Sequence, residues 1–221
     1  DQAMNWSPNR QWIVFHTHES GDDIWLMPAD GSGEARMISE DGSETGWPRW
    51  SPDGRSIAFK SFRRDGAGAR HAYVYVIGVD QETGETTAQR RVDMGNFPHD
   101  VVLAEWADEG DLLVFEAAEA IGRKSIWSVS GAGGMPRRIH SFGSDQVTSG
   151  IGVSHDRRWV AYVDRAPDGY YQIFRLPIAG GAPEQLTHDP SNKTQPSYSP
   201  TGDRIAFAVF SYQAHFWRVG P

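Results

Sequence analysis

The chain has 221 residues, no cysteine and a formal net charge of −8 at pH 7. Without cysteine it can form neither disulfides nor thiolate metal sites, and it has no cysteine nucleophile. No basic run could neutralise a phosphate backbone, and no stretch approaches the ~18 apolar residues of a membrane span, so we expect neither a nucleic-acid partner nor membrane insertion.

One sequence segment recurs along the whole chain. The clearest copy reads Trp-Ser-Pro-Asp-Gly over residues 50–54 and is followed by an apolar run. The five copies begin at Trp6, Trp50, Trp106, Val153 and Tyr198, with spacings of 44, 56, 47 and 45 residues; the third and fourth copies are the most divergent. Self-similarity at about 40–50 residues is typical of a propeller or a similar array.

Each repeat predicts four strands in the same order. A short apolar segment ends at the aromatic residue, and Ser-Pro-Asp-Gly then forms a turn in which Pro fixes φ and Gly tolerates a positive φ. A β-branched run such as residues 57–59 predicts a buried second strand, and an aromatic-rich run such as residues 73–76 predicts a third. A Gly-rich turn leads to a fourth strand, as at residues 184–187. Four short antiparallel strands joined by tight turns make a propeller blade.

The sequence therefore predicts an all-β propeller that forms a single domain over residues 1–221. The expected blades are about 1–45, 46–99, 100–147, 148–192 and 193–221, and the last lacks a fourth strand. A closed five-bladed ring is favoured because an open propeller would expose strand edges. The alternative is part of a propeller with six or seven blades.

The residues from Gln185 to Pro190 and from Gln195 to Phe207 resemble the TolB-type propeller repeat, a relative of the WD repeat. The resemblance covers nearly the whole chain and is weakest at residues 78–105 and around Val153. It implies the fold but no single activity, because the family includes translocation scaffolds, peptidase propellers and polysaccharide lyases. No Gly-x-Ser-x-Gly motif is present, so the hydrolase domain of the peptidase relatives is absent from this sequence.

Several histidines map to one predicted face of the propeller. Loops between fourth and first strands share that face with loops between second and third strands, and in WD-like folds it usually carries the ligand. Six of the eight histidines sort to these loops: His16, His18, His71, His99, His188 and His215. His16, His18 and His99 are the candidate ligands for a divalent transition metal such as Zn, Mn or Fe. Ordinary solvated loop residues are the simpler interpretation.

Acidic loops provide a second metal hypothesis, a structural Ca²⁺ ion. The sequences Asp22-Asp23, Asp65-Gly66 and Asp168-Gly169 fall in comparable loops. Oxygen-rich loops can hold Ca²⁺, although none of these has the spacing of an EF-hand. Turn formation by Asp-Gly explains them equally well.

The residue before the repeated aromatic differs in every repeat. It is Asn5, Arg49, Glu105, Gly152 and Ser197 in turn, on a strand expected to lie near the central channel. We therefore predict a ligand site formed by Arg49, His99, Asp100 and Glu105. His99 and Glu105 are the candidate catalytic residues if the site is an enzyme's.

Two classes of function follow. The favoured one is a non-catalytic scaffold that presents a loop face or its channel to a protein or glycan partner. The alternative is a carbohydrate-active enzyme, either a metal-assisted polysaccharide lyase or a glycoside hydrolase that uses a pair among Asp100, Glu105 and Glu116. A fragment whose function resides elsewhere in a longer protein is a third possibility. Because the chain begins at Asp1 rather than Met, as a processed exported protein would, we expect a bacterial periplasmic or extracellular location.

Overall fold

The computed structural model describes residues 4–17, 22–39, 44–64, 66–107, 112–120, 123–142, 150–199 and 201–210. These residues form strands, turns and loops but no helix. Accordingly, none of them belongs to a helix that could span a membrane.

The strands form five antiparallel sheets. The first contains β1 (Met4–Trp6), β2 (Trp12–Thr17), β3 (Asp23–Pro28) and β4 (Arg36–Met37). The second contains β5 (Glu44–Trp50), β6 (Ser56–Arg64), β7 (Arg70–Gly78) and β8 (Arg90–Arg91). The third contains β9 (Asp100–Ala107), β10 (Leu112–Ala120), β11 (Arg123–Ser130) and β12 (Arg137–Ser141). The fourth contains β13 (Ile151–Val153), β14 (Trp159–Arg165), β15 (Tyr171–Pro177) and β16 (Glu184–Gln185), and the fifth contains β17 (Asn192–Tyr198) and β18 (Ile205–Phe210).

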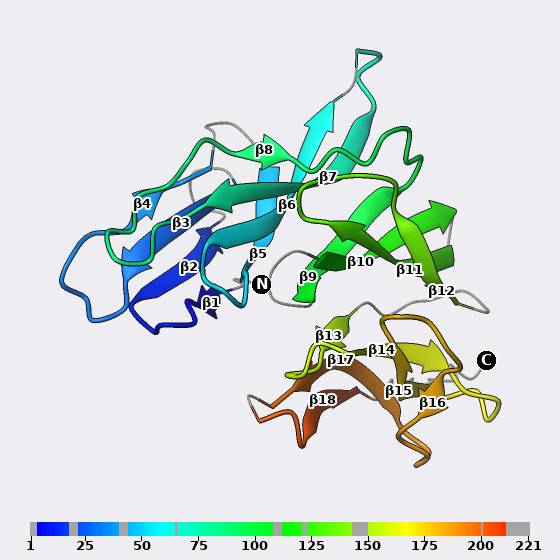
Figure 1. Cartoon of the computed structure of the whole chain (residues 1–221). Helices are drawn as coiled ribbons and strands as arrows, with labels where there is room; N and C mark the ends of the chain where they lie inside the picture. The colour runs from blue at the N-terminus through cyan, green and yellow to red at the C-terminus, as the bar shows by residue number, and fades with distance from the viewer. Residues whose placement is uncertain are drawn as a thin grey trace, which may run out of the picture.

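The sheets are arranged as propeller blades around a common centre (Figure 1). Within each sheet the strands pair in chain order, and the first strand of each sheet packs against the first strand of the next, in the series β1, β5, β9, β13 and β17. First strands therefore lie innermost. This confirms the all-β architecture of antiparallel, mostly four-stranded blades, whereas closure of five blades into a ring stays a prediction.

Apolar clusters fill the spaces between consecutive blades. Along β6, Ile57 and Phe59 pack with the first blade, while Ala58, which points to the other face, packs with the third. The cluster between the third and fourth blades includes Val114 and Tyr162. Because side chains alternate between the faces of a strand, one second strand contributes to the core on both sides of its blade.

The blades at the two ends of the series expose apolar side chains. Trp6 is 53% exposed on β1, whereas Trp50 and Trp106 at the equivalent position are 6% and 3% exposed. On β18, Val209 is 58% exposed. In the part of the chain that the structure describes, each inner blade is covered on both faces and each end blade on one.

The Ser-Pro-Asp-Gly turn is held by its serine and its aspartate. Ser51 is fully buried; its hydroxyl donates to Asp53 at 2.6 Å and accepts the Ser56 N–H at 2.9 Å. The Ser51 carbonyl accepts the Gly54 N–H at 2.9 Å, and Gly54 has φ +70°. Equivalent bonds recur in the turns at Ser7 and Ser154, whose hydroxyls donate to Asn9 and Asp156. In the turn at Ser199 the hydroxyl donates instead to Asp203, four residues on. The repeated residues of the motif are therefore the ones that form the turn.

We predict that Ser51→Ala lowers the free energy of unfolding by about 1–3 kcal/mol, because it leaves the partly buried Ser56 N–H without its acceptor, the hydroxyl of the fully buried Ser51. Chemical denaturation of the variant measures this loss. The matched control is Ser199→Ala, whose bonds lie in an exposed turn. An equal effect of the two substitutions would contradict the assigned role of burial.

Candidate functional site

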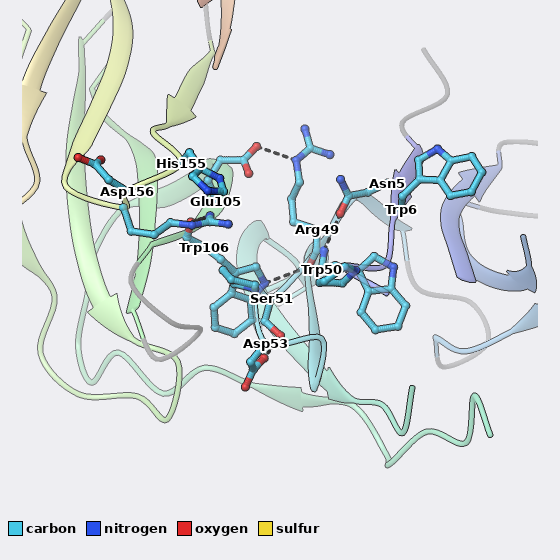
Figure 2. A pocket seen from close by; sticks show the side chains of 13 residues that line it. Asn5, Trp6, Arg49, Trp50, Ser51, Asp53, Glu105, Trp106, His155 and Asp156 are labelled. Carbon is cyan, nitrogen blue, oxygen red and sulfur yellow. Dashed lines mark hydrogen bonds and ion pairs between the residues drawn. The ribbon is translucent and has the colours of Figure 1, made fainter. Parts of the chain in front are cut away.

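A pocket of about 840 Å³ opens where the first strands of the inner blades end. Its walls come from equivalent positions of four consecutive blades (Figure 2). The lining residues are Asn5, Trp6, Pro8, Arg49, Trp50, Ser51, Pro52, Asp53, Glu105, Trp106, His155, Asp156 and Arg157. This end of the strands carries the Ser-Pro-Asp-Gly turns, so it lies opposite the loops that the histidine pattern favoured.

Arg49 and Glu105 meet in this pocket. The Arg49 Nε donates to Glu105 Oε1 at 2.6 Å across the gap between β5 and β9, and both side chains are about one-fifth exposed, at 23% and 20% (Figure 2). The Arg49 guanidinium also donates from Nη1 to the Pro48 carbonyl at 3.0 Å. Two of the four predicted ligand-binding residues are thus brought together as an ion pair that faces the pocket.

Arg157 adds a second guanidinium to the pocket. Its Nη1 donates to the Trp106 carbonyl at 3.1 Å, which links the turn of the fourth blade to β9. Burial lowers the pKa of Arg157 below its ordinary value, and the nearby negative charge of Glu105 opposes that shift. Arginine keeps its charge near neutral pH, so the pocket holds two cations on either side of one carboxylate.

The other two carboxylates of the pocket are engaged in their turns. Asp53 Oδ1 accepts the Ser51 hydroxyl and the Arg55 N–H, and Asp156 Oδ1 accepts the Ser154 hydroxyl at 2.5 Å and the Arg158 N–H at 3.2 Å. The Ser154 bond, with help from the Arg158 N–H, lowers the pKa of Asp156. Both carboxylates therefore already accept hydrogen bonds within their own turns.

Hydrogen bonds between neighbouring first strands fix the wall of the pocket. The Trp50 N–H donates to Asn5 Oδ1 at 2.8 Å, and the indole Nε1 of Trp106 donates to the Arg49 carbonyl at 2.9 Å. Each bond joins one blade to the next. The side chains at this rim are therefore held on a rigid backbone rather than on long loops.

His99 and Asp100 lie outside the pocket lining. The His99 ring packs beside Phe97 and Trp127, with centroids 5.1 and 5.9 Å away. Asp100 Oδ1 accepts the Ala72 N–H at 2.9 Å and lies 3.5 Å from His71 Nδ1. The structure thus divides the four predicted ligand-binding residues into two pairs, of which only Arg49 and Glu105 share a site.

His16 lies inside a strand rather than in a loop, which corrects its expected position. β2 continues through Thr17, and His16 is 1% exposed, stacked on Trp47 of the next blade at 5.9 Å between ring centroids. Trp47 also lies under the ammonium of Lys60, at 3.9 Å, and burial lowers the pKa of Lys60 to about 8. The periodic apolar run of β2 ends at Phe15, so the extra strand residues gave no sequence signal.

The predicted metal ligands do not form a shared cluster in the described ranges, where no group of three or more His, Asp or Glu side chains is placed to hold an ion. His18 and Asp65 lie outside those ranges. Of the calcium candidates, Asp23 is buried and accepts the Ser39 hydroxyl at 3.0 Å, and Asp168 accepts the Tyr170 N–H at 3.1 Å. Asp23 is the first residue of β3, and Asp168 lies in a turn.

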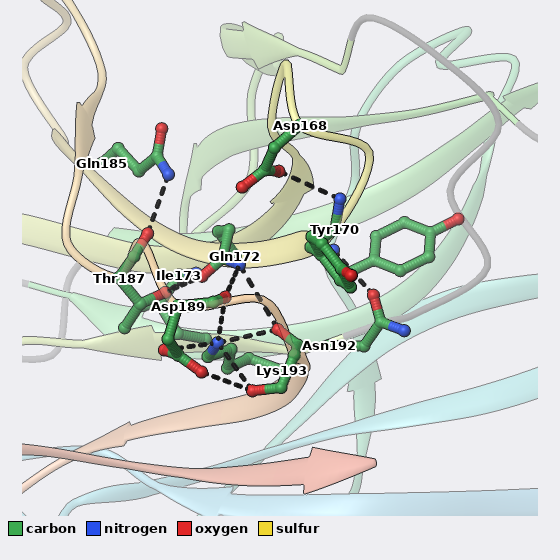
Figure 3. Close-up of polar contacts among 11 residues, drawn as sticks. Asp168, Tyr170, Gln172, Ile173, Gln185, Thr187, Asp189, Asn192 and Lys193 are labelled. Atoms are coloured by element: carbon green, nitrogen blue, oxygen red, sulfur yellow. Dashed lines mark hydrogen bonds and ion pairs between the residues drawn. The ribbon is translucent and has the colours of Figure 1, made fainter. Parts of the chain in front are cut away.

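The polar groups of the loop between β16 and β17 form hydrogen bonds with one another and with Gln172 of β15 (Figure 3). Lys193 is fully buried; its ammonium lies 2.6 Å from Asp189 Oδ1 and donates to the carbonyls of Asp189 at 3.1 Å and Ser191 at 2.7 Å. The Thr187 hydroxyl donates to Gln172 at 2.6 Å. The most typical part of the repeat motif is therefore explained by loop closure.

Glu116, the third carboxylate near an inner strand, lies between the third and fourth blades. It is 1% exposed; Oε1 accepts the Gly150 N–H at 3.3 Å, and Oε2 has no hydrogen-bond partner among the described residues. Burial raises the pKa of Glu116 to about 7, against the opposing positive charge of Lys124 and the Gly150 bond. Its surroundings are those of a core residue.

Sequence reasoning missed Arg157. Its turn reads Ser-His-Asp-Arg, without the Pro of the turns at Ser7 and Ser51, and it shares with Arg10 an arginine where Gly54 and Gly202 stand, so the repeat pattern marks it only as a divergent copy. The available signal was that divergence: an arginine replaces glycine at a turn position that needs a positive φ.

We predict that Arg49→Ala and Glu105→Ala each leave thermal stability nearly unchanged, because a partly exposed ion pair contributes at most about 1 kcal/mol. A double-mutant cycle by chemical denaturation measures their coupling. A large loss of stability in both single variants would assign the pair to the framework and remove it as a ligand site.

We also predict that Glu116 makes stability depend on pH. Because its folded pKa of about 7 lies above the ordinary glutamate value of 4.5, the unfolded chain releases this proton first as pH rises. Stability should therefore fall between those two pH values, by on the order of 3 kcal/mol, and stay low above them. Glu116→Gln should remove the slope.

Denaturation of the wild type and of Glu116→Gln between about pH 5 and pH 8 measures this difference. Glu82→Gln, at an exposed carboxylate, is the control and should keep the wild-type slope. Identical slopes for the wild type and Glu116→Gln would show that Glu116 is not the titrating group.

Solved structures resemble the chain throughout its length. A structure described as a TolB from Agrobacterium tumefaciens superposes with a TM-score of 0.72 at 20% identity, and the match covers 95% of this chain and 69% of that one. TolB from Acinetobacter baumannii gives a TM-score of 0.66 at 23% identity, over 93% of this chain and 48% of that one. At these identities the likeness concerns the fold.

Curated relatives include proteins named as peptidases. Dipeptidyl-peptidase 5 of Porphyromonas gingivalis is 28% identical over 187 residues, which cover 78% of this chain, and the peptidase YuxL of Bacillus subtilis is 25% identical over 85% of it. The chain spans 25% of the length of each. No family model matches it. The repeats and these superpositions agree on one conclusion: the chain has a TolB-type β-propeller fold.

Proposed function

We propose that the chain is a non-catalytic binding scaffold whose pocket at the ends of the first strands holds an extended segment of a protein partner. The observation that carries the proposal is the pair Arg49 and Glu105. These charged side chains occupy a position at which every repeat has a different residue, and they face the pocket. Neither is needed to form the turn or to fill the space between blades.

The composition of the pocket suits a polypeptide. Charged groups from three blades line the same pocket as the exposed indole of Trp6, so polar and apolar contacts are available together. The rim is preorganised by hydrogen bonds between blades, which reduces the ordering cost of binding. A protein partner also fits the fold that the chain shares with TolB structures.

A second candidate is the propeller unit of a larger peptidase-type protein. The similarity to dipeptidyl-peptidase 5 and YuxL over most of this chain favours it. The pocket would then hold a segment of a peptide substrate, while hydrolysis would require residues outside this sequence. Turnover of fluorogenic dipeptide substrates by this chain itself would overturn the non-catalytic proposal.

A glycan partner and the carbohydrate-active alternative have weaker support. Of the three carboxylates considered for that chemistry, Glu105 is paired with Arg49, Asp100 contacts His71, and Glu116 is buried. A periplasmic or extracellular location stays a prediction.

The test of the scaffold proposal is selection of binders from a library of random peptides displayed with free carboxyl termini. We expect an enriched family that binds the wild type and loses about tenfold or more in affinity to Arg49→Ala, because a charged hydrogen bond in a partly buried pocket is removed. Titration calorimetry of a synthetic member measures the loss.

The matched control is Arg158→Ala. Arg158 lies next to the pocket residue Arg157, but its side chain is 80% exposed and outside the lining. Equal binding to Arg49→Ala and Arg158→Ala, or no enriched family, would contradict the proposal.

A further inference from the structure

We propose that Arg49 and Glu105 together bind the main chain of one residue of the partner segment: the guanidinium donates to that residue's carbonyl, and the carboxylate accepts its N–H. This inference rests on the proposed function and names the part of the partner that the pocket recognises. The recognised groups are then the neutral peptide groups of an extended chain, rather than a charged side chain or a charged terminus.

The ion pair leaves one donor and one acceptor unused. Arg49 bonds through Nε to Glu105 Oε1 and through Nη1 to the Pro48 carbonyl. Within the described ranges, Arg49 Nη2 and Glu105 Oε2 have no hydrogen-bond partner. Because both side chains are partly exposed and line the pocket, these two groups are available to a ligand while the ion pair stays intact.

The rest of the lining also has unused groups of both kinds. Both bonds that the Asp53 carboxylate accepts go to Oδ1, so its Oδ2 has no partner among the residues that the structure describes. Arg157 donates from Nη1 alone in the same part of the chain. A ligand with acceptors only, or with donors only, would leave one kind unmatched. A peptide main chain carries an N–H and a carbonyl on each residue and matches both.

The charges of the pocket lining nearly cancel. Three carboxylates, those of Asp53, Glu105 and Asp156, stand against the guanidinium groups of Arg49 and Arg157. An anionic ligand group therefore meets like charges from the carboxylates, and a cationic one meets like charges from the guanidinium groups on either side of Glu105. An uncharged peptide group avoids both repulsions.

An extended chain presents its peptide groups in the arrangement that this pair requires. In an antiparallel ladder, one residue of a strand exchanges both its N–H and its carbonyl bond with the residue opposite. Arg49 and Glu105 lie on the adjacent first strands β5 and β9, joined at 2.6 Å. They offer one donor and one acceptor side by side, as the opposite residue of such a ladder does.

The experiment uses a synthetic peptide from the family selected on the wild type, with both ends capped so that it carries no terminal charge. We expect the capped peptide to keep its affinity. N-methylation of one residue should weaken its binding by about tenfold or more, because a hydrogen bond to a charged carboxylate is lost. N-methylation of the two neighbouring residues, whose N–H groups point to the other side of an extended chain, is the internal control and should have little effect.

Titration of the same peptides against Glu105→Ala assigns the contact. This variant should bind the parent peptide about as weakly as the wild type binds the N-methylated one, and N-methylation should cost nothing further in it. The matched control is Glu184→Ala. It breaks the pair between Arg175 and Glu184, which is 2.8 Å long and lies outside the pocket lining, and it should keep the full effect of N-methylation.

Salt provides an independent readout. Because the bound groups are uncharged, the affinity of the capped peptide should change by less than about twofold between about 0.05 M and 0.5 M salt. A tenfold weakening over that range would indicate a charged ligand group and overturn the proposal.

The possible failures are distinguishable. A scan in which no single N-methyl group weakens binding, or an N-methyl effect equally large in Glu105→Ala, would overturn the main-chain site and leave the scaffold proposal standing. Absence of any enriched peptide would overturn both. The scan on the wild type needs no variant, so it decides the question even if Glu105→Ala does not fold.

Discussion

Every blade of this protein has two apolar faces, and a neighbouring blade can cover only one of them. The sheets therefore pack face to face in chain order. They are arranged around a centre because the first strand of each sheet also packs against the first strand of the next. The same constraint explains why one strand serves two cores: Phe59 and Ala58 are adjacent in sequence and lie in different clusters. Burial of apolar surface between blades therefore gives the molecule its order.

The repeats divide the residues into two groups. Ser51, Asp53 and their counterparts complete the hydrogen bonds of the turn, and they recur because the backbone requires them. Arg49 and Glu105 occupy a position with no such duty, at the rim of the pocket. Residues that form the turns and residues that line the pocket are thus neighbours within one motif.

The fold could be predicted from the sequence because its determinants are local and repeated. Turn chemistry and apolar runs give the strands, and the equivalent positions of Arg49 and Glu105 on first strands predicted one shared site, although not the ion pair between them. The burial of His16 could not be predicted in this way, since it depends on Trp47 from the next blade. His99 likewise lies against Trp127, a contact set by tertiary packing.

The location of the pocket could not be predicted from the sequence either. Both ends of a first strand carry loops or turns, and the histidines favoured the end opposite the one where the pocket lies. Arg157 reaches it because a left-handed turn directs its side chain toward Trp106. Because Trp106 and Arg157 are far apart in the sequence, the sequence alone does not reveal their contact.

The rim has one further property. Its backbone nearly repeats from blade to blade, so a ligand that sensed only the backbone could bind in several rotated orientations of equal energy. Arg49 and Glu105 place opposite charges on adjacent blades at 2.6 Å. The dipole between Arg49 and Glu105 points from one blade to the next and removes this equivalence. A polar ligand therefore binds the pocket in one orientation.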